Sequence, residues 1–140
     1  MTTRRSFLAA TAAAAVTPAF AAKVPFKLGV ATYSLRKKTR PEAIAIIKEL
    51  GIKYVSVKEF HLPYKSTPAE LAAGRKEFAA AGLKILSGGN VGMADKDEAK
   101  LRSYFEYAKA AGMPMMVCAP THETLPMVHK LAKEFKIKLA

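Results

Sequence analysis

The hydrophobic pattern of the chain repeats about every thirty residues. A glycine followed by a short apolar run opens three segments: "GIKYVSV" at Gly51, "GLKILSG" at Gly82 and "GMPMMVC" at Gly112. A helix that ends in a left-handed glycine and leads directly into a strand produces this pattern. "FKLGVATYS" supplies a strand before the first repeat, and "FKIKLA", which lacks the glycine, supplies a last one.

The segments between these strands have the polar starts and apolar spacing of amphipathic helices. Thr67 precedes Pro68 and Glu70, which is the spacing of a capping box with a first-turn proline. The segments 39–42 and 95–98 have the same spacing. The pattern predicts strands at 27–33, 53–58, 83–88, 114–119 and from 137, and helices at 41–50, 68–81, 96–111 and 123–135.

Strands that alternate with single helices predict an α/β fold with a parallel sheet and right-handed crossovers. Two architectures share this pattern, an open doubly wound sheet and a closed barrel of eight units. A barrel built on such units needs about 250 residues. The chain of 140 residues holds about four βα units and the start of strand five. We therefore expect the N-terminal half of a parallel (β/α)8 TIM barrel, cut inside its fifth strand.

The first 21 residues have the order of an export signal. Arg4 and Arg5 precede an apolar run over 8–16, and Ala19 and Ala21 form a small-x-small cleavage site. The arginine pair followed by Phe-Leu is typical of a twin-arginine signal, and the apolar run is too short for a stable membrane anchor. We expect a signal peptide at 1–21, a barrel domain at 22–140, export by the twin-arginine machinery, and a periplasmic or secreted protein.

Composition narrows the function only slightly. The formal net charge is +12, with the basic residues spread along the chain. Export and the lack of an interleaved aromatic and basic patch argue against nucleic acid as a partner. Cys118 is the only cysteine, so no internal disulfide forms, and its apolar surroundings favour a buried small side chain.

At "KLGVATYSL", "VKEFHLP" and "GGNVG" the chain resembles the sugar phosphate isomerase/epimerase family with the xylose isomerase-like barrel. The resemblance covers 22–140, and many exported relatives also begin with a twin-arginine signal. It implies a (β/α)8 fold, a divalent metal (Mn, Mg, Co or Zn) at the mouth of the barrel, and proton transfer beside a sugar carbonyl. The family's metal ligands lie mainly on later strands, so we expect them beyond Ala140 and expect no metal bound by this chain alone.

Strand ends supply the candidate substrate-binding residues, because barrel enzymes build their sites at the carboxyl ends of their strands. If the valines of "YVSVKEFHLP" pack on helices, alternation directs Lys58 into the mouth. Ser56 stands where related barrels often place a glutamate. Glu59 and His61 lie two positions apart and so point to the same side of an extended chain, but one glutamate and one histidine are too few ligands to hold a metal. The candidates are Tyr33, Lys58, His61, Asn90 and His122.

Each candidate also has a structural interpretation. Lys58 is a lysine at a strand end that can simply reach solvent, "GGNVG" can be a long turn without a ligand, and His122 can decorate a helix start. The catalytic and metal-binding residues stay unknown. The leading hypothesis is a fragment of an exported, metal-dependent sugar isomerase or epimerase. The alternative is a non-catalytic half-barrel that acts through self-association or ligand binding, with open sheet edges that invite a homo-oligomer.

Overall fold

The sheet has five parallel strands in chain order. The structure, a computed structural model, describes residues 26–140. Its strands are β1 (Gly29–Ala31), β2 (Tyr54–Val57), β3 (Lys84–Met93), β4 (Met115–Pro120) and β5 (Lys138–Leu139). They pair in the order β1-β2-β3-β4-β5, all parallel. This order confirms the half-barrel prediction, because a doubly wound sheet would reverse its order within the sheet.

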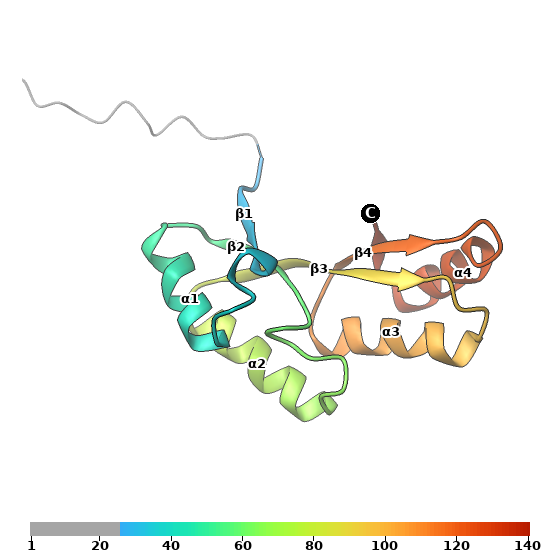
Figure 1. Cartoon of the computed structure of the whole chain (residues 1–140), viewed down its shortest axis with the longest axis horizontal. Coiled ribbons are helices and arrows are strands. Elements are labelled where there is room, and N and C mark those ends of the chain that lie inside the picture. The colour runs from blue at the N-terminus through green and yellow to red at the C-terminus, as the bar shows by residue number, and fades with distance from the viewer. Residues whose placement is uncertain (1–25) are drawn as a thin grey trace, which may run out of the picture.

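One helix follows each of the first four strands, and Figure 1 shows α1, α2 and α3 along the same side of the sheet. The helices are α1 (Arg40–Glu49), α2 (Pro68–Ala80), α3 (Glu98–Ala110) and α4 (Leu125–Phe135), and a short 3-10 helix, η1 (Thr32–Leu35), follows β1. Complete capping boxes start α1 and α2, as the sequence predicted.

The core lies between the sheet and these helices. Val55 and Val57 of β2 are 1% and 0% exposed and pack with the fully buried Phe78 of α2 and Phe105 of α3. The alternate residues of the same strands, such as Ser56, face the other side of the sheet and stay partly exposed. The strands therefore bury one face only, although parallel sheets usually have both faces covered.

Left-handed residues join the helices to the strands. Gly51, Gly82 and Gly112 have φ values of 67°, 77° and 69°, which confirms the function predicted for the repeated glycine. At the fourth junction, which lacks the glycine, Lys136 adopts a φ of 56°. The helix-to-strand junction therefore has one geometry throughout the half-barrel.

Several predicted boundaries were wrong. The strand expected at 27–33 stops at Ala31, where η1 begins, and the segment 88–92 belongs to the long strand β3 rather than to a turn. The third helix starts at Glu98, because the cap is Asp97, whose carboxylate accepts a hydrogen bond from Ala99 N–H. The fourth starts at Leu125 instead of 123. The predicted signal residues Arg4, Arg5, Ala19 and Ala21 lie outside the described residues.

Candidate functional site

An exposed aromatic pair lies at the carboxyl ends of the first two strands. Tyr33 of η1 and Phe60, which follows β2, are 51% and 47% exposed. Their ring centroids are 5.9 Å apart in an edge-to-face arrangement. The guanidinium of Arg36 lies over the Tyr33 ring at 4.6 Å from its centroid and adds a cation–π contact. The three side chains form a partly apolar platform at the edge where barrel enzymes bind substrates.

Lys58 lies directly after β2, at the same edge of the sheet as the aromatic pair. Val55 and Val57 are buried toward the helices, so alternation along the strand directs Lys58 to the opposite, helix-free side. Its backbone N–H donates a hydrogen bond of 2.9 Å to Oγ1 of the buried Thr32. This bond ties the ends of β1 and β2 together and fixes the start of the loop 58–67.

His61 lies beneath the surface of this loop. It is 1% exposed, and its Nε2 is 3.1 Å from the carbonyl oxygen of Lys38. Its Nδ1 has no hydrogen-bond partner among residues 26–140. The ring therefore joins the loop 58–67 to the segment before α1, and the structure gives it no open surface at the mouth.

Two further side chains hold the same loop by its backbone. Arg40 donates to the carbonyl oxygen of His61 at 3.1 Å and forms a bidentate ion pair with Glu77 at 2.7 and 2.6 Å. The Tyr107 hydroxyl donates to the carbonyl oxygen of Leu62 at 2.7 Å. The hydrogen bond between Arg40 and Glu77 raises the pKa of the guanidinium and lowers the pKa of the carboxyl. The segment that carries Phe60 is thus hydrogen-bonded to α1 and α3, and Glu77 of α2 holds the Arg40 side chain in place.

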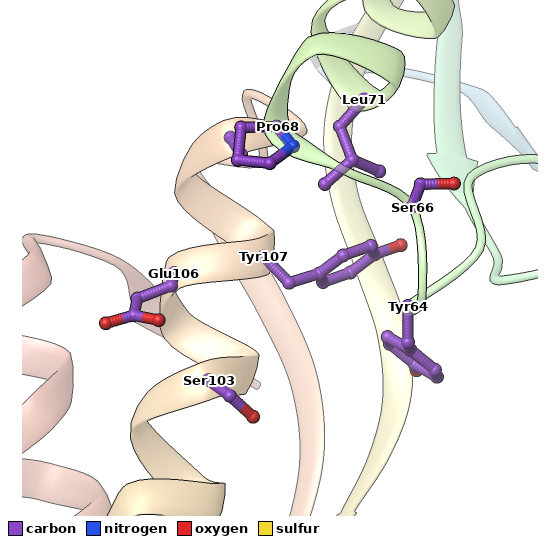
Figure 2. Close-up of a pocket in the computed structure, with 8 residues that line it drawn as sticks. Tyr64, Ser66, Pro68, Leu71, Ser103, Glu106 and Tyr107 are labelled. Atoms are coloured by element: carbon purple, nitrogen blue, oxygen red, sulfur yellow. The ribbon is translucent and has the colours of Figure 1, made fainter.

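A tyrosine cluster lies between this loop and α3. The rings of Tyr64 and Tyr107 are 4.7 Å apart, and they line a cavity of about 180 Å³ with Ser66, Ser103 and others. Figure 2 shows the Tyr107 side chain reaching from α3 toward the segment that carries Tyr64 and Ser66. Burial and, to a smaller extent, the Glu59 carboxylate raise the pKa of Tyr64 to about 12. The His61 ring instead contacts the Lys38 carbonyl oxygen, and within residues 26–140 His61 and Glu59 belong to no group of three potential metal ligands.

The remaining candidates lie on the β3–β4 side of the mouth. Asn90 is an exposed residue within β3, and the exposed His122 follows β4. Pairing of Met93 with Pro120 extends both strands to this edge, where the Thr124 hydroxyl donates to Met93 O at 2.6 Å. Within residues 26–140, no hydrogen bond or ion pair joins Asn90 or His122 to the platform.

The donor groups of the described residues do not fit a divalent cation. No group of three His, Cys, Asp or Glu side chains converges anywhere in residues 26–140. Burial raises the pKa of the lone Cys118 thiol, which keeps it protonated and a poor ligand or nucleophile. In the same part of the chain, each helix is too short or too polar to cross a membrane.

Sequence reasoning identified Tyr33 and Lys58 but missed Phe60, Arg36, Thr32 and Arg40. Phe60 carried a usable signal, because a large apolar residue directly after a strand is out of place in a turn. The others carried none. A threonine, two arginines and their partners far along the chain become neighbours only when strands and helices pack.

Solved structures share this fold over about half their length. An uncharacterised protein from Parabacteroides distasonis ATCC 8503 has a TM-score of 0.73 and 21% identity, over 82% of this chain and 52% of that one. A D-psicose 3-epimerase crystallised in the presence of D-fructose has a TM-score of 0.60 and 16% identity, over 81% and 51%. A sugar phosphate isomerase/epimerase from the same Parabacteroides strain gives 0.56 and 16%, over 85% and 51%.

At such low identities the likeness shows the fold alone. The fold is that of about half a parallel TIM barrel, as the sequence predicted. No family model matches the chain, and no curated protein matches it.

Proposed function

We propose that this chain forms one wall of the sugar-binding mouth of an isomerase- or epimerase-type barrel. The exposed pair Tyr33–Phe60 carries the proposal. Aromatic rings at a binding edge present flat apolar faces to a ligand, and nearby polar groups fix its orientation. A sugar has both kinds of surface, since its ring carbons pack on an aromatic face while its hydroxyls bind polar side chains.

The candidate residues would then have separate tasks. Tyr33 and Phe60 would pack against the sugar ring, and Arg36 would hold Tyr33 in position. Lys58 would donate to a hydroxyl or carbonyl oxygen, whereas Asn90 and His122 offer both donors and acceptors from the other side of the mouth. His61 would support the loop from beneath.

The described residues bind and orient a sugar but do not supply its chemistry. Isomerisation needs a base within about 3 Å of the proton that it removes, and an electrophile for the carbonyl oxygen. His61 is 1% exposed and lies against Lys38, so it is not placed as that base. The proposal assigns the base and the ligands of a divalent metal (Mn, Mg, Co or Zn) to the other half of the barrel.

Two measurements test whether the base and the metal ligands lie outside this half of the barrel. We expect weak binding in a calorimetric titration of the chain with MnCl2, and no turnover of D-fructose in an epimerisation assay. Tight stoichiometric Mn2+ binding together with turnover would contradict it and would make this half-barrel a working enzyme.

The platform itself is tested by saturation-transfer NMR with D-fructose as the probe. We expect transfer to the sugar from the wild-type chain and its loss in Tyr33→Ala/Phe60→Ala. Phe26→Ala is the matched control, because Phe26 is an exposed aromatic residue, at 64%, that precedes β1 and so lies away from the carboxyl ends of the strands. Equal transfer from the wild-type chain and the double variant would overturn the proposed sugar platform.

We also propose export through the twin-arginine route, on the strength of the sequence 1–21. Replacement of Arg4 and Arg5 by lysine should leave the precursor in the cytoplasm. Normal export of that variant would remove the twin-arginine assignment, although a signal peptide of another kind would still be possible.

The alternative of a half-barrel that acts by association keeps one supporting observation. One face of the sheet carries no helices, and β1 and β5 each pair on one side only within the described chain. The lysines on that face favour an acidic partner over a second copy of this chain.

A further inference from the structure

Three lysines lie together on the helix-free face of the sheet. Lys27 precedes β1, Lys84 opens β3 and Lys138 opens β5, so all three lie at the amino ends of the strands, opposite the candidate mouth. They line one cavity of about 390 Å³ with Leu86, Pro114 and Met115. All three lysines are exposed.

The strand geometry fixes the side to which they point. Ile85 is 8% exposed and belongs to the core, so its neighbour Lys84 faces away from the helices. Leu139 packs against the core, so the preceding Lys138 also faces away from the helices. Lys138 pairs across the sheet with Met115, which lines the same cavity. The Lys27 ammonium lies 5.9 Å from the ring centroid of Tyr54, the residue that pairs with Lys84.

These lysines come from alternate strands. In a closed barrel, each interior layer is built by side chains from alternate strands. In such a barrel Lys27, Lys84 and Lys138 would therefore occupy three of the four positions of one interior layer. The fourth side chain of that layer would come from a strand on the opposite side of the barrel. Among residues 26–140 none of the three forms an ion pair. Covering three unpaired ammonium groups is costly unless the covering surface supplies negative charge.

We propose that the helix-free face binds a parallel βα segment of different sequence, which presents carboxylates to Lys27, Lys84 and Lys138. A second copy of this chain is the wrong partner, because two copies that close a barrel around a common axis would bring their lysines into the same layer. The proposal shares with the proposed function the expectation of a second half-barrel, but its lysine contacts and its mixing experiment do not depend on sugar binding.

Apolar surface at both edges of the sheet suits a partner of this kind. Phe26 and Leu28, beside β1, are 64% and 62% exposed. Beside β5, a groove of about 420 Å³ is lined by the apolar residues Ala132, Ile137 and Leu139 and by four basic ones, His129, Lys133, Lys136 and Lys138. A segment that continues the sheet would cover these residues with its own helices, while the lysines would select its charge.

A charge-reversed copy of the chain serves as the probe. The wild-type chain is mixed with an isotope-labelled Lys27→Glu/Lys84→Glu/Lys138→Glu chain, and native mass spectrometry counts the two homodimers and the heterodimer. In about 50 mM salt we expect the heterodimer to form at least about tenfold more tightly than either homodimer, since three partly exposed ion pairs can contribute this much together. In about 1 M salt, where charges are screened beyond about 3 Å, the preference should largely disappear.

The matched control reverses three exposed lysines on the helices and loops, in Lys48→Glu/Lys65→Glu/Lys76→Glu, with the same change in net charge. We expect this control chain to form no heterodimer with the wild-type chain that is tighter than the homodimers. A neutralised variant, Lys27→Gln/Lys84→Gln/Lys138→Gln, should self-associate in low salt more strongly than the wild-type chain, and it replaces the glutamate variant if circular dichroism shows that the latter does not fold.

Each other outcome overturns the proposal. An equal preference for the control variant would mean that only total charge matters. Wild-type homodimers as tight as the heterodimer in low salt would make a second copy the partner. The absence of a heterodimer, and of stronger association in the glutamine variant, would mean that this face has no such partner.

Discussion

The two faces of the sheet are built from the same strands but have opposite surroundings. Toward the helices, Val55, Val57 and Met116 are at most 1% exposed and join a continuous core with Phe78 and Phe105. On the other face, polar and basic residues alternate with partly exposed apolar ones. One face holds the core of this chain, whereas we propose that the other receives a ligand at the carboxyl ends of the strands and a partner at the amino ends.

The largest expected difference between the faces is the cost of removing a large side chain. Phe105→Ala should lower the free energy of unfolding by about 3–5 kcal/mol, because Phe105 is fully buried and its loss leaves a cavity. Leu86→Ala, on the partly exposed face, should cost less than about 1 kcal/mol, since little area leaves water there. Urea unfolding of both variants measures the contrast. Equal losses would show that the helix-free face is covered in solution.

Two glycines of β3 sharpen the comparison within one strand. Gly89 has a φ of 104°, and a β-carbon there would collide with the carbonyl oxygen of Val117. Gly92 has no atom within 4 Å of such a carbon. Gly89→Ala should therefore cost about 1–3 kcal/mol, and Gly92→Ala close to nothing. Urea midpoints that rank the two variants in the reverse order would contradict the described path of β3.

The loop that carries Phe60 depends on the buried hydroxyl of Tyr107. Tyr107→Phe leaves the Leu62 carbonyl without its donor and should cost about 1–2 kcal/mol. Tyr104→Phe is the control, because the Tyr104 ring packs against Tyr64 and the core while its hydroxyl forms no hydrogen bond within residues 26–140. If the loop also positions the aromatic platform, Tyr107→Phe should weaken saturation transfer to D-fructose. An unchanged unfolding midpoint would exclude an anchoring contribution from this hydrogen bond.

The smallest expected effect concerns pH. The hydrogen bond from Arg40 lowers the pKa of Glu77 in the folded state, so the carboxylate stabilises the fold above its unfolded pKa. That contribution is lost as the pH falls through the lowered folded pKa. Because Glu77 is 42% exposed, we expect only about 0.5 kcal/mol. Glu77→Gln should therefore lose less stability than the wild-type chain between neutral pH and about pH 3, as measured by urea unfolding. Identical losses would show that the ion pair does not stabilise the fold.

Periodicity and local chemistry determined the fold from the sequence. Repeated glycines before apolar runs, capping boxes and helical apolar spacing are local signals, and they predicted the half-barrel, the parallel strand order and the left-handed glycines. The position of Lys58 directly after β2 also followed from local pattern, whereas its contribution to a binding site stays a prediction. Strand ends were less accurate, since the turn at Thr32 and the extension of β3 through Asn90 depend on neighbouring strands.

Only the tertiary structure decided which residues meet. The contact of Tyr33 with Phe60, the burial of His61 against Lys38, and the bonds from Arg40 and Tyr107 to one loop all join residues distant in the sequence. The same is true of Lys27, Lys84 and Lys138, which looked like scattered surface charge until the strand register placed them in one cavity. The physical reason is that hydrophobic period specifies which face a residue occupies, whereas contacts across a sheet depend on register and packing between whole elements.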